Sequence, residues 1–490
     1  MEAQRDRITP YLETIFSRAE FRTTSSEARA RACVSELRRP EAVAWTESLL
    51  LGTLDGCSYS GRGSDLDTAR HNLAQRLAIG IRSGGAFVRR QPRPWIITAL
   101  RSSLAMFLYS LVSPYLSVYT MGLGASATQL GFVNSAGMAA AGLIAPFIGW
   151  IIDRRGVRQI YLVGIAFLAL SYLTYAIAGT WSIAVLAMVA YWLGKGMSGQ
   201  SCSTICGNSI RSEDRATAMS LCETLAAGAL GMLAPLLGAA VVARFGGVNV
   251  AGIRPLFYLS LSGTLGTFLM VYLLIPNCRW TEAADRSRHI LRDLSTVLRS
   301  DEKLGRWLVI DAIGFLPMGM VIPFAQPFAH DIKGADELIL GMMITAFALT
   351  PLVLGIPVGR LADRIGRKRV LYVTIPLSWL SGVALILAPN SGVLVLSGAL
   401  LGFTTVSAVT AGAMAYELVP KAHMGRWLGI SRMFRMLLGA AAATLAGLIW
   451  DHLGPAYVFL TVIGIELCIR MPLLITMPET LHLTHHAETG

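Results

Sequence analysis

The chain alternates between long apolar stretches and short polar connections from residue 95 onward. A helix needs about 20 mostly apolar residues to cross the hydrocarbon layer of a membrane. Twelve stretches of that kind follow one another, so we predict an all-α polytopic membrane protein with twelve transmembrane helices. The predicted spans are residues 95–120, 127–152, 159–179, 181–209, 216–243, 254–276, 306–329, 336–359, 369–388, 391–416, 425–450 and 455–477.

The polar segments around these spans predict the domain organisation. We expect an N-terminal extension over residues 1–94, six-helix bundles over 95–276 and 306–477, a central loop over 277–305 and a tail over 478–490. Apolar residues recur at helical spacing in the central loop, which predicts an amphipathic helix on the membrane surface. A short apolar leader is missing near Met1, so we expect no signal peptide and a cytoplasmic extension.

Composition and charge support a membrane protein and argue against several other classes of protein. Hydrophobic residues make up 54% of the chain and charged residues 15%, which excludes a disordered chain. Seven scattered cysteines predict neither a disulfide framework nor a metal site, and we expect no cofactor. The net charge of +12 could indicate a nucleic-acid partner, so its placement decides the interpretation.

The positive charge gathers in alternate loops. The loops at 153–158, 210–215, 277–305, 360–368 and 417–424 carry most of the basic residues after residue 94. The positive-inside rule places these loops in the cytoplasm. Both termini are then cytoplasmic in an integral protein of the plasma membrane, and the charge needs no nucleic-acid partner.

A sequence motif occurs twice, 210 residues apart, and indicates two related halves. Both copies end a predicted span, the second and the eighth. Two pseudo-symmetric six-helix halves are typical of transporters, whose substrate site lies between the halves near the midplane. The copies contain Gly149, Asp153, Arg154, Gly156 and Arg158, and Gly359, Asp363, Arg364, Gly366, Arg367 and Lys368.

The second copy resembles motif A of the major facilitator superfamily, Gly-x-Leu-Ala-Asp-Arg-x-Gly-Arg-Lys, at every fixed position. The resemblance covers residues 95–477 and implies that family's twelve-helix fold. We expect Gly149 and Gly359 to allow close helix approach. Asp153 and Asp363 are expected to face the positive N-terminal end of a helix in the other half and to form a cytoplasmic gate in the outward-open state. An ordinary basic loop would explain one copy but not two.

Two further segments resemble motifs of the same family. Lys195-Gly-Met-Ser-Gly199 is similar to motif B, with Lys in place of the usual Arg, a cation that the family associates with proton transfer. A charge near the middle of a membrane is costly and usually functional, although a structural charge pair would also explain Lys195. Residues 228–239 resemble motif C of exporters that exchange substrate for protons, and a packing kink is the alternative.

Other charges inside the predicted spans need partners. Glu466 and Arg470 are four residues apart, a spacing that favours a pair on one helix. The remaining charges are Arg101, Glu223, Asp311, Arg432 and Arg435.

The repeat suggests how those five charges pair. Arg101 and Asp311 occupy equivalent positions in the two halves, as do Glu223 and Arg432. Ion pairs within each half would join Arg101 to Glu223, and Asp311 to Arg432 or Arg435. Alternatively, the carboxyl groups of Glu223 and Asp311 are proton carriers, since burial brings a carboxyl pKa towards neutrality.

These observations together predict a secondary active transporter that works by alternating access, as a monomer, on a small-molecule substrate. The motif resemblances favour proton-coupled export of a small organic compound. Import or facilitated diffusion of a metabolite is the alternative. A membrane enzyme or receptor would require a catalytic cluster or an asymmetric helix count, and neither is evident in the sequence.

Overall fold

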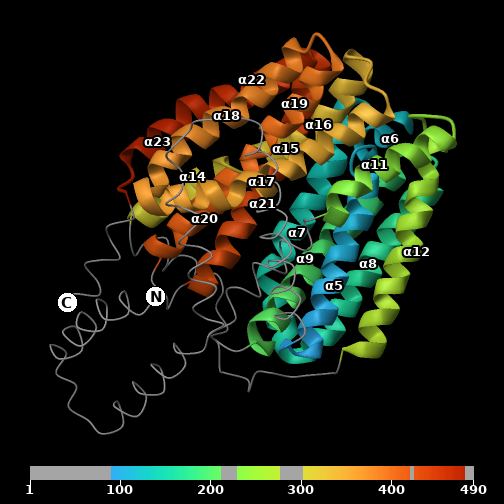
Figure 1. Cartoon of the computed structure of the whole chain (residues 1–490), viewed down its shortest axis with the longest axis horizontal. Coiled ribbons are helices and arrows are strands. Elements are labelled where there is room, and N and C mark those ends of the chain that lie inside the picture. Colours follow the sequence, from blue (N-terminus) through green and yellow to red (C-terminus); the bar gives the residue numbers. More distant parts are fainter. Residues whose placement is uncertain (1–89, 211–228, 276–301, 420–423, 480–490) are drawn as a thin grey trace, which may run out of the picture. The chain divides into compact units, whose positions relative to one another are not determined.

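The helices of the first half follow the predicted spans closely. The computed structural model describes residues 90–210, 229–275, 302–419 and 424–479, all within the compact unit Val88–Gly490. The predicted extension and amphipathic central helix lie outside these residues. The described part of the first half contains α5 (Arg93–Val112), α6 (Leu116–Gly122), α7 (Ala127–Arg155), α8 (Val157–Ile177), α9 (Trp181–Ser209), α11 (Ala229–Arg244) and α12 (Val250–Leu274) (Figure 1).

The second half repeats this order with more interruptions. It consists of α14 (Glu302–Ile313), α15 (Leu316–Met320), α16 (Ile322–Pro327), η2 (Phe328–Ile332), α17 (Glu337–Ile365), α18 (Arg367–Leu387), α19 (Ser391–Leu401), α20 (Phe403–Leu418), α21 (Met424–His452), α22 (Pro455–Ile465), η4 (Glu466–Arg470) and α23 (Met471–Thr476). The described residues contain helices and no strand. Ten of their segments are long and apolar enough to cross a membrane. The all-helical membrane fold is therefore confirmed, and a count of twelve spans is compatible with it.

Several predicted spans are broken inside the membrane. The first is interrupted at 113–115 and the seventh is divided into four short segments. Pro114, Pro317 and Pro323 lie at or next to these breaks, because proline lacks the N–H that continues a helix. Membrane helices tolerate such breaks where neighbouring groups satisfy the freed carbonyls.

Glycine makes the sharp connection in each copy of the repeated motif. Gly156 joins α7 to α8 and Gly366 joins α17 to α18, each as a single residue between two helices. Their φ angles of 91° and 107° are unfavourable for residues with a side chain. The shared glycine of the motif is thus required by the turn. We call the end of the bundle with these two turns the basic end.

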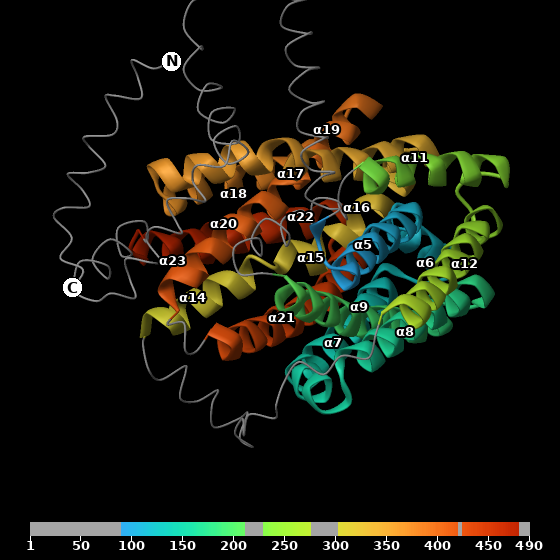
Figure 2. The ribbon, with the colours of Figure 1, turned by 60° about the horizontal axis from the view of Figure 1, so that its bottom comes forward.

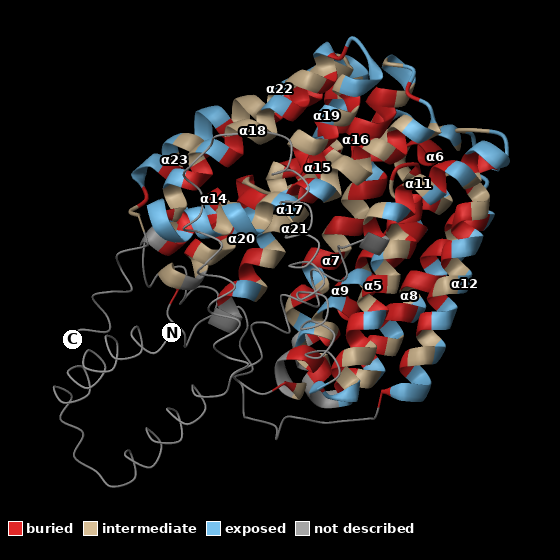
Figure 3. Cartoon of the chain, in the orientation of Figure 1, coloured by how far each residue is buried: buried red, intermediate tan, exposed pale blue. Residues whose placement is uncertain are grey.

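The outward faces of the helices are apolar. Exposed leucine, valine and tyrosine side chains follow α12 and α18, among them Leu265, Leu269, Tyr272, Val373 and Leu380, and Figure 3 shows exposed positions along α12. An apolar patch of this extent is unusual for a protein in water and suits a lipid surface.

The buried core joins the two halves at the end opposite the basic end. One cluster combines side chains of both halves, such as Leu130 and Val133 with Ala442 and Ala446. Near the basic end the core divides into a cluster of first-half residues around Tyr161 and a cluster of second-half residues. The halves therefore share a hydrophobic core at the opposite end and have separate cores at the basic end.

Two equivalent helix crossings are the largest contacts between the halves in the described residues. Helix α7 packs on α21, and α11 packs on α17 (Figure 2). A β-carbon at Gly131 of α7 would lie 2.3 Å from the carbonyl oxygen of Ala443, and one at Gly341 of α17 would lie 2.8 Å from that of Pro235. Gly341 follows Gly131 by 210 residues, the offset of the repeated motif. Both crossings thus depend on a glycine at the same place in each half.

Three hydrogen bonds strengthen this contact. The carboxylate of Asp451, in the last turn of α21, accepts one from the backbone N–H of Thr128 in the first turn of α7, at 2.8 Å. The Tyr115 hydroxyl donates to the carbonyl of Glu337 at 2.8 Å. Thr345 of α17 donates to the carbonyl of Met232 in α11 at 3.1 Å. A carboxylate at a helix N-terminus is favourable, so Asp451 holds the two halves together at the opposite end.

Substitution of Gly131 by alanine should loosen the crossing of α7 and α21. The new methyl group would overlap a backbone carbonyl, and overpacking typically costs about 1–3 kcal/mol. We expect a lower midpoint of thermal unfolding in detergent for Gly131→Ala. The matched control is Gly266→Ala in α12, where a β-carbon meets no atom within 4 Å. That change should be neutral or stabilising, because alanine favours helix. Equal midpoints for the two variants would contradict the close crossing.

Candidate functional site

Lys195 lies in the middle of α9 and among aromatic rings. Its Nζ is 5.0 Å from the ring centre of Trp192, 5.4 Å from that of Tyr109 and 5.6 Å from that of Tyr191. Tyr109 comes from α5 and stacks on Tyr191 at 5.3 Å. Lys195 is nevertheless exposed, as is Gly199 one turn further along the helix. The ammonium group is stabilised by ring faces and remains accessible.

Arg432 of the second half approaches the same part of α9. Its Nη2 lies 3.9 Å from the position that a β-carbon on Gly196 would take. Gly196 follows Lys195 directly, so two cations from different halves come together at the boundary. In the part of the chain that the structure describes, neither cation has a carboxylate within 4.0 Å.

Asp311 pairs with the next cation on the same helix. Its Oδ2 is 3.5 Å from Nε of Arg435 and accepts a hydrogen bond from Ser431, so the carboxylate of α14 bridges to α21. The Arg435 guanidinium also lies 5.9 Å from the ring centre of Phe315. Of the two partners expected for Asp311, the structure has Arg435. Arg432 is left to face Lys195.

Arg101 is buried in the first half. Only 5% of its surface is exposed, and its guanidinium lies 5.0 Å from the ring centre of Tyr161 on α8. Its Nε and Nη2 make no hydrogen bond to the described residues. Its expected partner Glu223 lies outside the described residues, so the pair of Arg101 with Glu223 stays a prediction.

The second copy of the loop motif binds the helices of its own half together. Arg367 forms an ion pair with Glu417 of α20 at 2.7 Å and a longer one with Asp363 at 3.4 Å. Lys368 donates to the carbonyls of Ile475 and Met477, at the end of α23, at 2.8 and 2.6 Å. Cations commonly bind the last carbonyls of a helix in this way.

The first copy makes a matching contact. Arg158 is equivalent to Lys368, and it donates to the carbonyl of Tyr272 in the last turn of α12 at 2.5 Å. In each half, the last cation of the motif therefore connects two places: the turn between the second and third spans of that half, and the end of its sixth span. The surroundings of Gly149 and the side chains of Asp153 and Arg154 lie outside the described set.

In the described residues of the second motif copy, Asp363 makes no contact with the other half, so the gate expected for the outward-open state stays a prediction. The side chain of Asp363 is 67% exposed, and Arg364 beside it is exposed too. A β-carbon at Gly359 would meet no atom within 4 Å, so the close helix approach expected there is also not made. This agrees with the division of the hydrophobic core at the same end.

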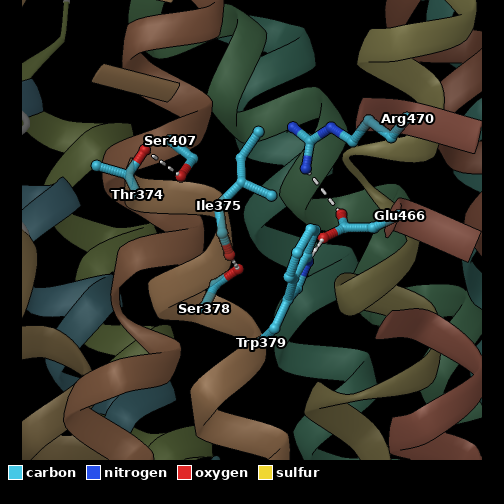
Figure 4. A network of polar contacts seen from close by, with 7 residues as sticks. All are labelled: Thr374, Ile375, Ser378, Trp379, Ser407, Glu466 and Arg470. Carbon is cyan, nitrogen blue, oxygen red and sulfur yellow. Dashed lines mark hydrogen bonds and ion pairs between the residues drawn. The ribbon is translucent and has the colours of Figure 1, made fainter. Parts of the chain in front are cut away.

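A second polar network lies inside the second half (Figure 4). Glu466 and Arg470 form the expected pair at 2.7 Å, and Trp379 of α18 donates its ring N–H to the same carboxylate. The Glu466 side chain is 1% exposed. A cavity of about 20 Å³ beside it is lined also by Ser378 and Thr404, which is room for one water. With partners on both oxygens, Glu466 is structural in this conformation.

Some important residues could not be recognised from sequence. Trp379, Tyr109 and Asp451 contact their partners from distant helices, and nothing in their own neighbourhoods marks them. Gly131 and Gly341 did carry a signal, because they share the offset of the repeated motif.

Comparison with known proteins identifies the family. The model of the "Major Facilitator Superfamily" matches residues 98–315 and 307–484. A multidrug resistance protein MdtG of Serratia proteamaculans is 24% identical over 54% of this chain, which covers 64% of that relative's length. A fosmidomycin resistance protein of Escherichia coli is 25% identical over 79% of this chain and 91% of its own.

Solved structures share the fold at low identity. A nucleoside transporter, NupG, superposes with a TM-score of 0.68 at 14% identity, over 79% of this chain and 100% of that one. A D-xylose–proton symporter has a TM-score of 0.63 at 15% identity, over 79% and 98% of the two chains. The loop motifs, the two related halves and these matches agree. The chain is an integral membrane transporter rather than an enzyme, and it belongs to the major facilitator superfamily.

Proposed function

We propose that this chain exports a small organic compound from the cytoplasm by proton-coupled alternating access. The observation that carries the proposal is the arrangement of the halves. In the described residues they share a buried core at the opposite end and have separate cores at the basic end, and Arg432 of the second half approaches α9 beside Lys195 of the first. A site between two halves that are joined at one end is reachable from the other end.

The charge distribution supports the orientation. Basic loops mark the cytoplasmic side of a membrane protein, so the basic end faces the cytoplasm and both termini lie there. The described conformation is then open to the cytoplasm. The other state requires the basic end to close and the contact through Gly131, Gly341 and Asp451 to separate.

The direction of transport rests on the relatives. Proteins named for multidrug and fosmidomycin resistance match 54% and 79% of this chain, which favours export. A monomer in the plasma membrane is part of the proposal. The fold alone does not set the direction, since a D-xylose–proton symporter shares it. Import with protons is therefore the second candidate.

Asp311 is the proton carrier in this proposal. Its carboxylate joins α14 to α21 through Arg435 and Ser431. Protonation would remove the charge that holds Arg435, and α21 also forms the crossing with α7. Proton binding at Asp311 and movement of the halves are thereby coupled through one helix. Glu223 is the alternative carrier.

Proteoliposomes that contain the purified full chain would distinguish the two directions of coupling. With an acidic interior, protons leaving the vesicle should drive accumulation of an exchanged compound. We expect uptake of fosmidomycin or of ethidium under this gradient and not under the reversed one. Uptake that requires an acidic exterior would instead establish symport, and no response to either gradient would remove proton coupling.

Asp311→Asn should uncouple transport from the proton gradient. The amide cannot exchange a proton, so we expect accumulation under an acidic interior to fall at least tenfold, while exchange of labelled for unlabelled substrate continues. Asp331→Asn, at an exposed carboxylate of η2, is the matched control and should behave as wild type. Gradient-driven accumulation that survives in Asp311→Asn would assign the proton to another residue.

The two ends should respond in opposite ways to loss of a carboxylate. Asp363→Asn weakens closure of the basic end, and Asp451→Asn weakens closure of the opposite end. Both should slow transport. Alkylation of a cysteine introduced at the exposed Ser203 of α9, in a background without native cysteines, should become faster in Asp363→Asn and slower in Asp451→Asn. The same shift in both variants would contradict the proposed pair of gates.

A further inference from the structure

The interiors of the predicted spans hold more cations than carboxylates. With the first two residues of each span left aside, their interiors carry five cations and three carboxylates. Charges within a membrane are usually paired with one another. The cations are Arg101, Lys195, Arg432, Arg435 and Arg470, and the carboxylates are Glu223, Asp311 and Glu466.

Two pairs in the second half account for part of this set. Asp311 is held by Arg435 and Ser431, and Glu466 by Arg470 and Trp379. One carboxylate, Glu223, remains for three cations. Whichever of them Glu223 neutralises, two positive charges are left in the interior of the spans.

Lys195 and Arg432 are the two cations that meet at the boundary between the halves. Arg101 is instead enclosed within the first half against Tyr161, and its repeat-equivalent Asp311 is paired within the second. Two cations brought together in a medium of low polarity repel each other. An anion placed between them offsets this repulsion. A carboxylate neutralises one of the two charges, and a doubly ionised phosphate or phosphonate neutralises both.

The surroundings of Lys195 favour an organic anion. The guanidinium of Arg432 can hold phosphate, phosphonate or carboxylate oxygens in a bidentate manner, and the ammonium of Lys195 can add a third contact. Tyr109, Tyr191 and Trp192 lie around the ammonium group. Their rings provide an apolar wall for the carbon part of such a molecule.

We propose that the transported compound is an organic acid, whose phosphate, phosphonate or carboxylate group binds between Lys195 and Arg432. The inference rests on the proposed function as a transporter with its substrate site between the halves. It adds the chemical class of the substrate and the two residues that select it. Because these residues belong to different halves, the acid would bridge them.

Calorimetric titration of the purified full chain in neutral detergent tests the proposal. Phenylphosphonate and benzoate are the acidic probes, and benzylammonium is the cation of matched size. We expect the acids to bind and benzylammonium not to bind. Lys195→Gln and Arg432→Gln should each weaken binding of the acids about tenfold or more, as for the loss of a charge-assisted hydrogen bond. Lys195→Arg and Arg432→Lys should retain most of the affinity.

The matched control is Arg244→Gln, which removes an exposed cation from the last turn of α11 and should leave binding unchanged. Unfolding midpoints of all variants separate loss of binding from loss of fold. The titration is repeated in nanodiscs of phosphatidylcholine with and without phosphatidylglycerol. Equal affinity for the acids in the two kinds of nanodisc assigns the site to a free acid. Weaker binding of the acids in the presence of phosphatidylglycerol would show competition by the lipid and overturn that assignment.

The inference fails if no acid binds more tightly than benzylammonium, or if the glutamine variants bind the acids as well as wild type. Failure of the proposed function has a different signature. Proton-driven accumulation of ethidium without binding of the acids would leave export standing and remove the anion site. Binding of the acids without a response to either proton gradient would leave the anion site standing and remove proton-coupled export.

Discussion

The close approach of two helix backbones at glycine is the constraint on which this structure depends. At Gly131 and at Gly341 a carbonyl oxygen of the other half occupies the space of a side chain. In the described residues, the core that the halves share surrounds these crossings. The separate cores at the basic end, the accessible Lys195 and the exposed Asp363 all follow from joining the halves at a single end.

The charged residues fall into two groups, those that contact their own half and those that reach the other half. Arg367, Lys368 and Arg158 bind groups of their own half and keep each six-helix unit intact. Asp451 and Arg432 reach across the boundary. Contacts within a half can persist through a transport cycle, whereas contacts across the boundary have to form and break. Charged residues of the first kind maintain the fold of each half, and those of the second kind change partners during transport.

Hydrophobic periodicity and the repeated motif predicted the helices and the two halves, because these features depend on local pattern. The motif marked Gly156 and Gly366 as shared residues, and the structure shows that they form the turns. Helix breaks at Pro114 and Pro317 were less predictable, since proline is tolerated inside membrane helices. The four-residue spacing of Glu466 and Arg470 correctly predicted the ion pair between them. Trp379 and Tyr109 could not be found, because their contacts with Glu466 and Lys195 join helices that are distant in sequence. Tyr191 and Trp192 precede Lys195 by four and three residues on α9, a spacing that does predict contact on one helix face.

The backbone nature of the crossings has a consequence for how such a protein can change over evolutionary time. A seal made from glycine and carbonyl groups uses no specific side chain of the substrate site. Residues around Lys195 can therefore be replaced to accept a new compound without altering the seal. The transported compound can therefore change in evolution while the seal between the halves is preserved, provided that the two glycines stay in place.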